Sequence, residues 1–157
     1  GVLKKSALLL FVAIITIYSI SKQDETVEKK SINVENCSIM EKTCQVQITN
    51  SASISFDITP KGMPPTKPAV ANLQLNLSAK AVELRFEGVD LDYQPPTVQL
   101  SKINSTTYSG EAFLSLCTLE KTKWVAHLTI HTSEKIWEIS FPFIHSGDGY
   151  DIIAPSS

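Results

Sequence analysis

The chain has 157 residues, a net charge of −2 at neutral pH, 43% hydrophobic residues and 19% charged residues. This length suits one domain of ordinary size, and the hydrophobic fraction is sufficient for a core. No Lys/Arg cluster is longer than a pair. The composition therefore argues against a nucleic-acid partner, because phosphate binding needs a concentrated basic surface.

The first predicted element is a transmembrane helix over residues 1–22 that serves as an uncleaved anchor. Its apolar run, Ala7 to Ile20, carries no charge and has lysines on both sides. Basic residues before an apolar run favour a cytoplasmic N-terminus, so we expect the anchor in the inner membrane and the rest of the chain in the periplasm. The alternative is a cleaved signal peptide, with Ser19-Ile20-Ser21 near the cleavage position.

Residues 23–36 are polar, mixed in charge and without periodicity, and they predict a tether. From Cys44 onward, apolar and polar residues alternate, which is typical of half-buried antiparallel strands. The residues expected to face inward are Cys44, Val46, Ile48, Ile54, Phe56, Ile58, Leu73, Leu75, Leu77, Val82, Leu84, Phe86, Val98, Leu100, Ala112, Leu114, Leu116, Trp124, Ala126, Leu128, Ile130, Trp137, Ile139, Phe141 and Phe143.

Turn residues separate these segments at intervals of about ten residues. Seven or eight short strands in this arrangement predict an all-β fold, an immunoglobulin-like antiparallel β-sandwich over residues 37–145. We expect residues 146–157 to form a flexible tail. His145 is then placed just after the last strand, close to this tail.

The three cysteines allow one disulfide. Cys37 and Cys44 flank the short loop "SIMEKT", which can bring them within disulfide distance. In an exported domain, cysteines become oxidised to disulfides. We therefore expect Cys37 to pair with Cys44 and Cys117 to remain a thiol. Pairs of Cys117 with either partner stay open as alternatives. The spacing matches neither a zinc site nor a C-x-x-C redox pair.

Copper binding is an alternative role, because Met40, Met63 and Cys117 are soft ligands that suit Cu(I). The histidines support it poorly. His127 and His131 lie on the same outward face of one predicted strand, about 13 Å apart, which is too far to share one ion. We otherwise expect no cofactor.

Catalytic motifs are absent from the sequence: it contains no Gly-rich phosphate loop, no G-x-S-x-G and no H-E-x-x-H. Asp90 and Asp92 could act as paired carboxylates or calcium ligands, but in a loop that ends in prolines they are also ordinary turn residues. The chain is therefore predicted not to be an enzyme. Two loops, "KGMPPTKP" and "VDLDYQPP", are the expected partner-binding regions, through Met63, Leu91 and Tyr93.

Several features together resemble a known group of proteins: an N-terminal apolar segment, C-x6-C, "FEGVDL", a strand ending in "LSLC" and a strand that begins with Trp. Over roughly residues 37–143, the chain is similar in layout to FixH-like and YtkA-like periplasmic sandwich domains of membrane-anchored proteins in Gram-negative bacteria. The resemblance implies association with the inner membrane, respiratory oxidases and copper handling. Copper-related relatives carry methionines after the "VD" dipeptide, where Leu91 and Tyr93 stand here.

These observations favour a non-enzymatic, membrane-anchored periplasmic module that binds another membrane or periplasmic protein, as an accessory subunit or assembly factor of a respiratory complex. One alternative is a copper-binding or copper-chaperone domain. A further alternative is an extracellular adhesion or ligand-binding domain. Glycosylation at the acceptor motifs that begin at Asn76 and Asn104 would support the latter in a eukaryotic host.

Overall fold

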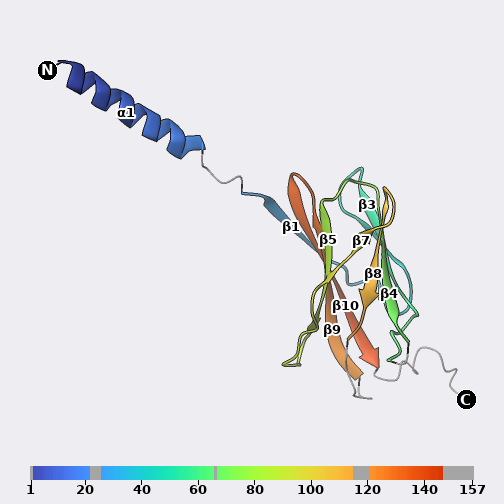
Figure 1. Cartoon of the computed structure of the whole chain (residues 1–157). Helices are drawn as coiled ribbons and strands as arrows, with labels where there is room; N and C mark the ends of the chain where they lie inside the picture. The colour runs from blue at the N-terminus through green and yellow to red at the C-terminus, as the bar shows by residue number, and fades with distance from the viewer. Residues whose placement is uncertain (1, 22–25, 66, 115–120, 147–157) are drawn as a thin grey trace, which may run out of the picture.

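The computed structural model describes residues 2–21, 26–65, 67–114 and 121–146. These residues form one helix and ten strands, arranged in two five-stranded sheets with the orders β1-β10-β9-β5-β6 and β2-β3-β4-β8-β7 (Figure 1). The prediction of an all-β sandwich is confirmed in this general form. The elements are α1 (Val2–Ser21), β1 (Glu28–Asn33), β2 (Cys44–Gln47), β3 (Ser53–Thr59), β4 (Ala69–Leu75), β5 (Ala81–Gly88), β6 (Val98–Gln99), β7 (Ser101–Lys102), β8 (Thr107–Ala112), β9 (Lys121–His131) and β10 (Lys135–Ser146).

Helix α1 coincides with the segment predicted to be a transmembrane anchor, residues 1–22. Among the residues that the structure describes, however, no helix is long and apolar enough to cross a membrane. The described side chains of this helix, from Lys5 to Ile15, are all exposed.

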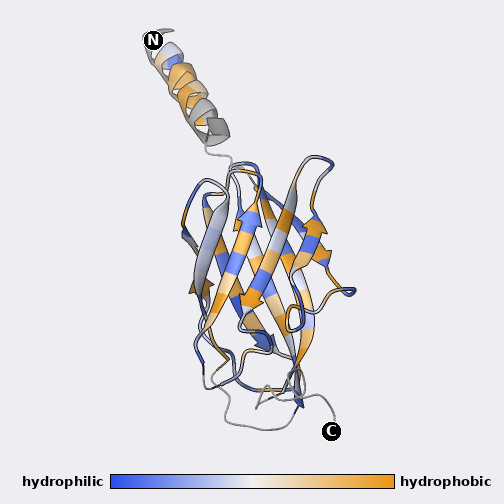
Figure 2. Cartoon of the chain, turned by 90° about the vertical axis from the view of Figure 1, so that its right-hand side faces the viewer, coloured by the Kyte–Doolittle hydropathy of each residue, from blue (hydrophilic) through white to orange (hydrophobic). Residues whose placement is uncertain are grey.

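The core lies between the two sheets and follows the predicted alternation. Figure 2 shows the hydrophobic and hydrophilic bands that alternate along the strands. Aromatic side chains join the sheets: the rings of Phe56 on β3 and Phe141 on β10 have centroids 5.2 Å apart. Trp124 is 1% exposed at the start of β9. Of the residues predicted to face inward, Leu77 and Val98 are only partly buried, and Leu116 lies outside the described residues.

The segment 23–36 was predicted to be a tether, and this prediction is wrong for Glu28–Asn33. These residues form β1, which pairs in parallel with β10 in the register Glu28↔Lys135 to Asn33↔Ser140. Most of the strand is exposed, so it carries no apolar alternation that sequence analysis could detect. Backbone pairing and the Lys29–Glu138 ion pair of 2.9 Å attach it to the sheet.

One edge of the sandwich is closed by a chain segment that changes sheets. Strand β6 pairs with β5, and after Leu100 the chain continues as β7, which pairs with β8 of the other sheet. Leu100 is 6% exposed and covers the core between the two strands. Gly110 on β8 permits this close approach, because a Cβ atom there would lie 2.8 Å from Cδ2 of Leu100.

The two ends of the sandwich differ in their relation to the N-terminus. Because β1 runs parallel to β10, the chain joins the sheet beside Lys135, at the end where β10 begins. Strands β5 and β10 are both antiparallel to β9 and finish at the opposite end, which we call the far end. The loop 89–97 follows β5 there. Residues 63–65, 67–68 and 113–114 border a hollow with His145 near the end of β10, so they also lie at the far end.

Candidate functional site

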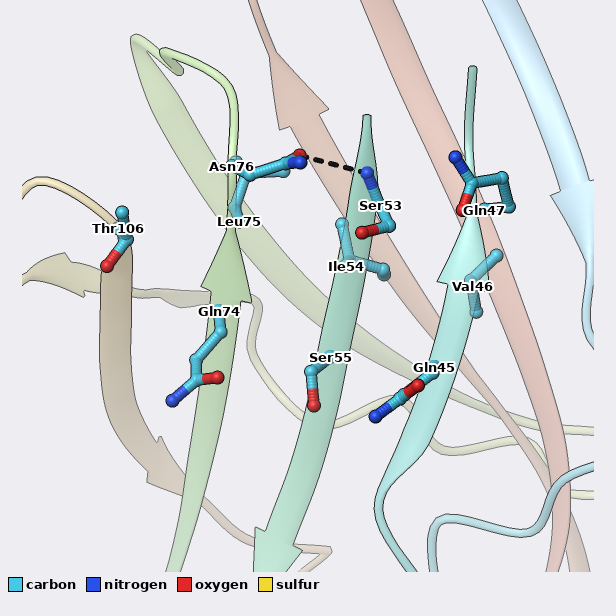
Figure 3. A pocket seen from close by; sticks show the side chains of 10 residues that line it. All are labelled: Gln45, Val46, Gln47, Ser53, Ile54, Ser55, Gln74, Leu75, Asn76 and Thr106. Carbon is cyan, nitrogen blue, oxygen red and sulfur yellow. Dashed lines mark hydrogen bonds between the residues drawn. The ribbon is translucent and has the colours of Figure 1, made fainter. Parts of the chain in front are cut away.

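A hollow of about 570 Å³ lies on the outer face of strands β2, β3 and β4. Two rows of polar side chains cross these strands (Figure 3). Gln45, Ser55 and Gln74 form one row by their register. Gln47 and Ser53 form the next row by theirs, and Asn76, just after β4, joins it through its hydrogen bond to Ser53. We call these six residues, with Thr106 beside them, the polar trough.

The shape of the polar trough follows from the side chains of the central strand. Ser53 and Ser55 on β3 are short, whereas the neighbouring positions on β2 and β4 carry longer amides. Neighbouring strands lie about 4.8 Å apart, so the amide walls are roughly 10 Å apart across β3. Val46, Ile54 and Leu75 alternate with the trough residues and point into the core, so they supply only the floor.

Hydrogen bonds fix one end of the polar trough and leave the other end free. Asn76 Oδ1 accepts a bond from the Ser53 backbone N–H at 2.9 Å, and Asn76 Nδ2 donates to the Ser51 carbonyl at 3.2 Å. Gln47 Nε2 donates to the Thr49 carbonyl at 2.5 Å. The side chains of Gln45, Gln74, Ser53 and Ser55 make no hydrogen bond to other described residues.

The outer face of the opposite sheet is chemically different, because it carries charged groups in pairs. His127 lies at its centre, where Nε2 donates to a Glu87 carboxylate oxygen at 2.6 Å and Nδ1 lies 3.1 Å from the Ser140 hydroxyl. The hydrogen bond from Lys29 lowers the pKa of Glu138 below its usual value. His127 and His131 do share this face, as predicted, but the His127 side chain is only 13% exposed.

The far end of the sandwich carries most of the exposed large hydrophobic residues of the described sandwich. Val89 is 54% exposed, Tyr93 43%, Phe113 48% and Ile144 56%. Val89 and Ile144 flank Lys123: the Val89 N–H donates to the Lys123 carbonyl at 3.0 Å, and Ile144 pairs with Lys123 in the β9–β10 register.

The structure separates the three predicted partner-binding residues. Tyr93 is exposed, so its predicted role is compatible with its position. Leu91 is partly buried and folds back on the strand: a Cβ atom on Gly88 would lie 2.8 Å from its own Cβ. The placement of Met63 on an exposed binding surface is wrong, because its side chain is 5% exposed and belongs to the core. Met63 has φ of 45°, which turns the loop over the end of the sandwich.

His145 differs most from its predicted place. It was expected beyond the last strand, but β10 continues to Ser146, and His145 is 3% exposed. Its Nε2 lies 3.0 Å from the Met63 carbonyl, which only accepts, so Nε2 carries a proton and donates it. The Nδ1 atom has no hydrogen-bond partner among the described residues. The bond joins Met63 to the end of β10, beside a hollow of about 530 Å³.

The predicted disulfide is confirmed. Cys37 and Cys44 are bonded, with their Cα atoms 5.8 Å apart. The bridge closes the loop that connects β1 with β2, and Cys44 is fully buried as the first inward residue of β2. Cys117 lies outside the described residues, so the prediction that it is a free thiol stays a prediction.

The alternative copper ligands do not form an accessible site among the described residues. The side chains of Met40 and Met63 are 2% and 5% exposed. The third predicted ligand, Cys117, lies outside the described residues. Within residues 2–21, 26–65, 67–114 and 121–146, no group of three or more His, Cys, Asp and Glu side chains could hold a metal ion. Asp90 and Asp92 belong to no such group.

Sequence reasoning missed the polar trough, since its residues come from three strands whose pairing order is not visible in the sequence. The buried position of His145 had a signal: it continues the period-two series from Trp137 through Phe143.

Comparisons with protein-family models, curated proteins and solved structures found no match for this chain. The resemblance to FixH-like and YtkA-like domains therefore stays a prediction.

Proposed function

We propose that the chain is a non-enzymatic periplasmic binding module, attached to the inner membrane through residues 1–22, whose far end docks onto another membrane or periplasmic protein. In this role it serves as an accessory subunit or assembly factor, with a respiratory complex as the class of partner. The observation that carries the proposal is the group of exposed hydrophobic residues at the far end, Val89, Tyr93, Phe113 and Ile144.

The direction of the chain supports this arrangement. Residues 5–15 of α1 expose apolar side chains such as Leu9, which is 71% exposed, and these need an apolar environment such as lipid. The sandwich begins beside Lys135, close in sequence to α1. Strand β10 has 12 residues, so the far end lies about 40 Å further along the sheet. An attachment at one end thus leaves the hydrophobic far end free for a partner.

Two further features agree with an exported sandwich module. Disulfides such as Cys37–Cys44 persist in oxidising compartments, the periplasm included. The order β3-β4-β8-β7 facing β10-β9-β5-β6 corresponds to the A-B-E-D and G-F-C-C′ strands of immunoglobulin-like sandwiches, with β1 and β2 as additions. Such sandwiches carry their binding loops at the two ends, which is where Tyr93 lies.

The test is co-purification. The wild-type chain and its variants are extracted from their own membranes with a mild detergent, and the amount of bound partner is compared. A stoichiometric membrane partner is expected with the wild-type chain. Tyr93→Ala combined with Val89→Ser should weaken retention at least about tenfold, because buried aromatic anchors dominate interface energies. The matched control is Ile103→Ser, which removes a hydrophobic residue that is 64% exposed near the other end. A chain that elutes as a clean monomer, or that loses its partner equally in the control, would contradict the proposal.

Copper carriage is the alternative role, although the side chains of Met40 and Met63 are only 2% and 5% exposed. The Gly62 N–H donates to the Met40 carbonyl at 3.0 Å, which brings the segments of Met40 and Met63 together. Titration of the reduced chain with Cu(I) against a bathocuproine-type competitor tests it, and a chain that takes no Cu(I) from the competitor excludes this role.

A further inference from the structure

We propose that the polar trough is a binding site for a neutral glycan, separate from the far end. The trough is a hollow of about 570 Å³ on the flank of the sandwich, within the range of roughly 300–1,000 Å³ that is typical of small-ligand sites.

The absence of charge selects a neutral ligand. All seven side chains of the trough are amides or hydroxyls, and none of the residues that line the hollow is Asp, Glu, Lys, Arg or His. An anionic or cationic ligand would lose hydration there without gaining an opposite charge. The outer face of the other sheet, with its Glu87–His127 and Lys29–Glu138 pairs, has the opposite character.

The chemistry of the side chains selects a ligand rich in hydroxyl groups. An amide offers both donors and acceptors, and a serine hydroxyl does both as well. Gln45, Ser55 and Gln74 present these groups in one row at the spacing of adjacent strands (Figure 3). A sugar also donates and accepts through each hydroxyl, so it can pair with successive members of the row.

Preorganisation favours binding at the second row, which Gln47, Ser53 and Asn76 form. The bonds of Asn76 to the Ser53 N–H and the Ser51 carbonyl, and of Gln47 to the Thr49 carbonyl, already hold these two amides. Ordering side chains on association costs free energy, and this cost is smaller where the side chains are already held. Each fixed amide still has unused hydrogen-bonding capacity for a ligand.

A peptide fits this surface less well than a glycan. An extended peptide that adds to a sheet gains its main-chain hydrogen bonds from an open edge. The edge strand β2 forms only one side of the trough, and β3 at its centre is already paired with both β2 and β4. The inward residues Val46, Ile54 and Leu75 are at most 8% exposed and offer little contact to apolar side chains. Among the described residues, no aromatic ring lines the trough for stacking, so we expect weak binding.

The test is saturation-transfer NMR on the full chain in a detergent without a sugar headgroup. The probes are cellotetraose, maltotetraose and chitotetraose, with tetragalacturonic acid as the anionic counterpart. We expect saturation of at least one neutral tetrasaccharide and none of the anionic one. Gln45→Ala combined with Gln74→Ala should weaken this binding at least about tenfold, since two hydrogen-bonding side chains are lost.

The control variant is Thr129→Ala, on the outer face of the opposite sheet, which should bind like the wild-type chain. Trough positions are exposed or half-exposed, so the double variant is expected to keep the wild-type circular dichroism spectrum. Binding of no neutral sugar, stronger binding of the anionic sugar, or equal binding by the double variant would overturn the proposal. Because the far end is untouched, co-purification of a protein partner should persist in the double variant.

Discussion

Removal of the Cys37–Cys44 bridge should destabilise the sandwich by an amount set by the loop that it closes. The sequence separation is 7, for which loop-closure entropy in the unfolded chain predicts about 2.4 kcal/mol at room temperature. Cys37→Ala is the appropriate change, because Cys37 is only partly buried, whereas Cys44 is 0% exposed and would leave a cavity. The thiol of Cys44 then continues to fill the core.

Urea unfolding of the full chain, followed by tryptophan fluorescence, measures this effect. Trp124 and Trp137 are 1% and 8% exposed, so their emission reports on the sandwich. With a urea dependence of about 1–3 kcal/mol per molar, the midpoint should fall by roughly 1 M. Reductant should shift the wild-type midpoint by a similar amount and leave that of Cys37→Ala unchanged. An unchanged midpoint in Cys37→Ala would refute the loop-closure argument, and a reductant effect in the variant would reveal a second bridge.

Three further changes test other parts of the fold. Gly110→Ala should lower stability by about 1–3 kcal/mol, because the new methyl group meets the segment that crosses between the sheets, and thermal melting measures the loss. The pKa of Glu138 is lowered by its hydrogen bond from Lys29, so this contribution to stability is present above the ordinary value of 4.5 and is lost as pH falls through the lower folded-state pKa. Urea midpoints across this acidic range should therefore depend less on pH in Glu138→Gln, and equal slopes would contradict the assignment. His145→Leu leaves the buried Met63 carbonyl without its donor and should cost about 1–3 kcal/mol in a urea titration, whereas a neutral effect would show that water replaces the imidazole.

Features that depend on neighbours in sequence were predictable. The alternation in segments such as "AVELRFEG" indicates strands with one buried face, and Val82, Leu84 and Phe86 are at most 1% exposed. The Cys37–Cys44 bridge closes a short loop, so proximity along the chain was sufficient to predict it. Both signals are local: a strand's side chains alternate with a period of two, and a short loop closes at low entropic cost.

Features that depend on strand pairing were decided only by the tertiary structure. β1 has no apolar period, and it belongs to the sheet because the backbone of β10 was available for pairing. Met63 and His145 are far apart in sequence, and only the closing of the far end buries both. The polar trough requires β2, β3 and β4 to be adjacent and in one register, which brings Gln45, Ser55 and Gln74 into a row. The period of a strand tells which side chains share a face, but the identity of its neighbours follows from long-range hydrogen bonding and core packing.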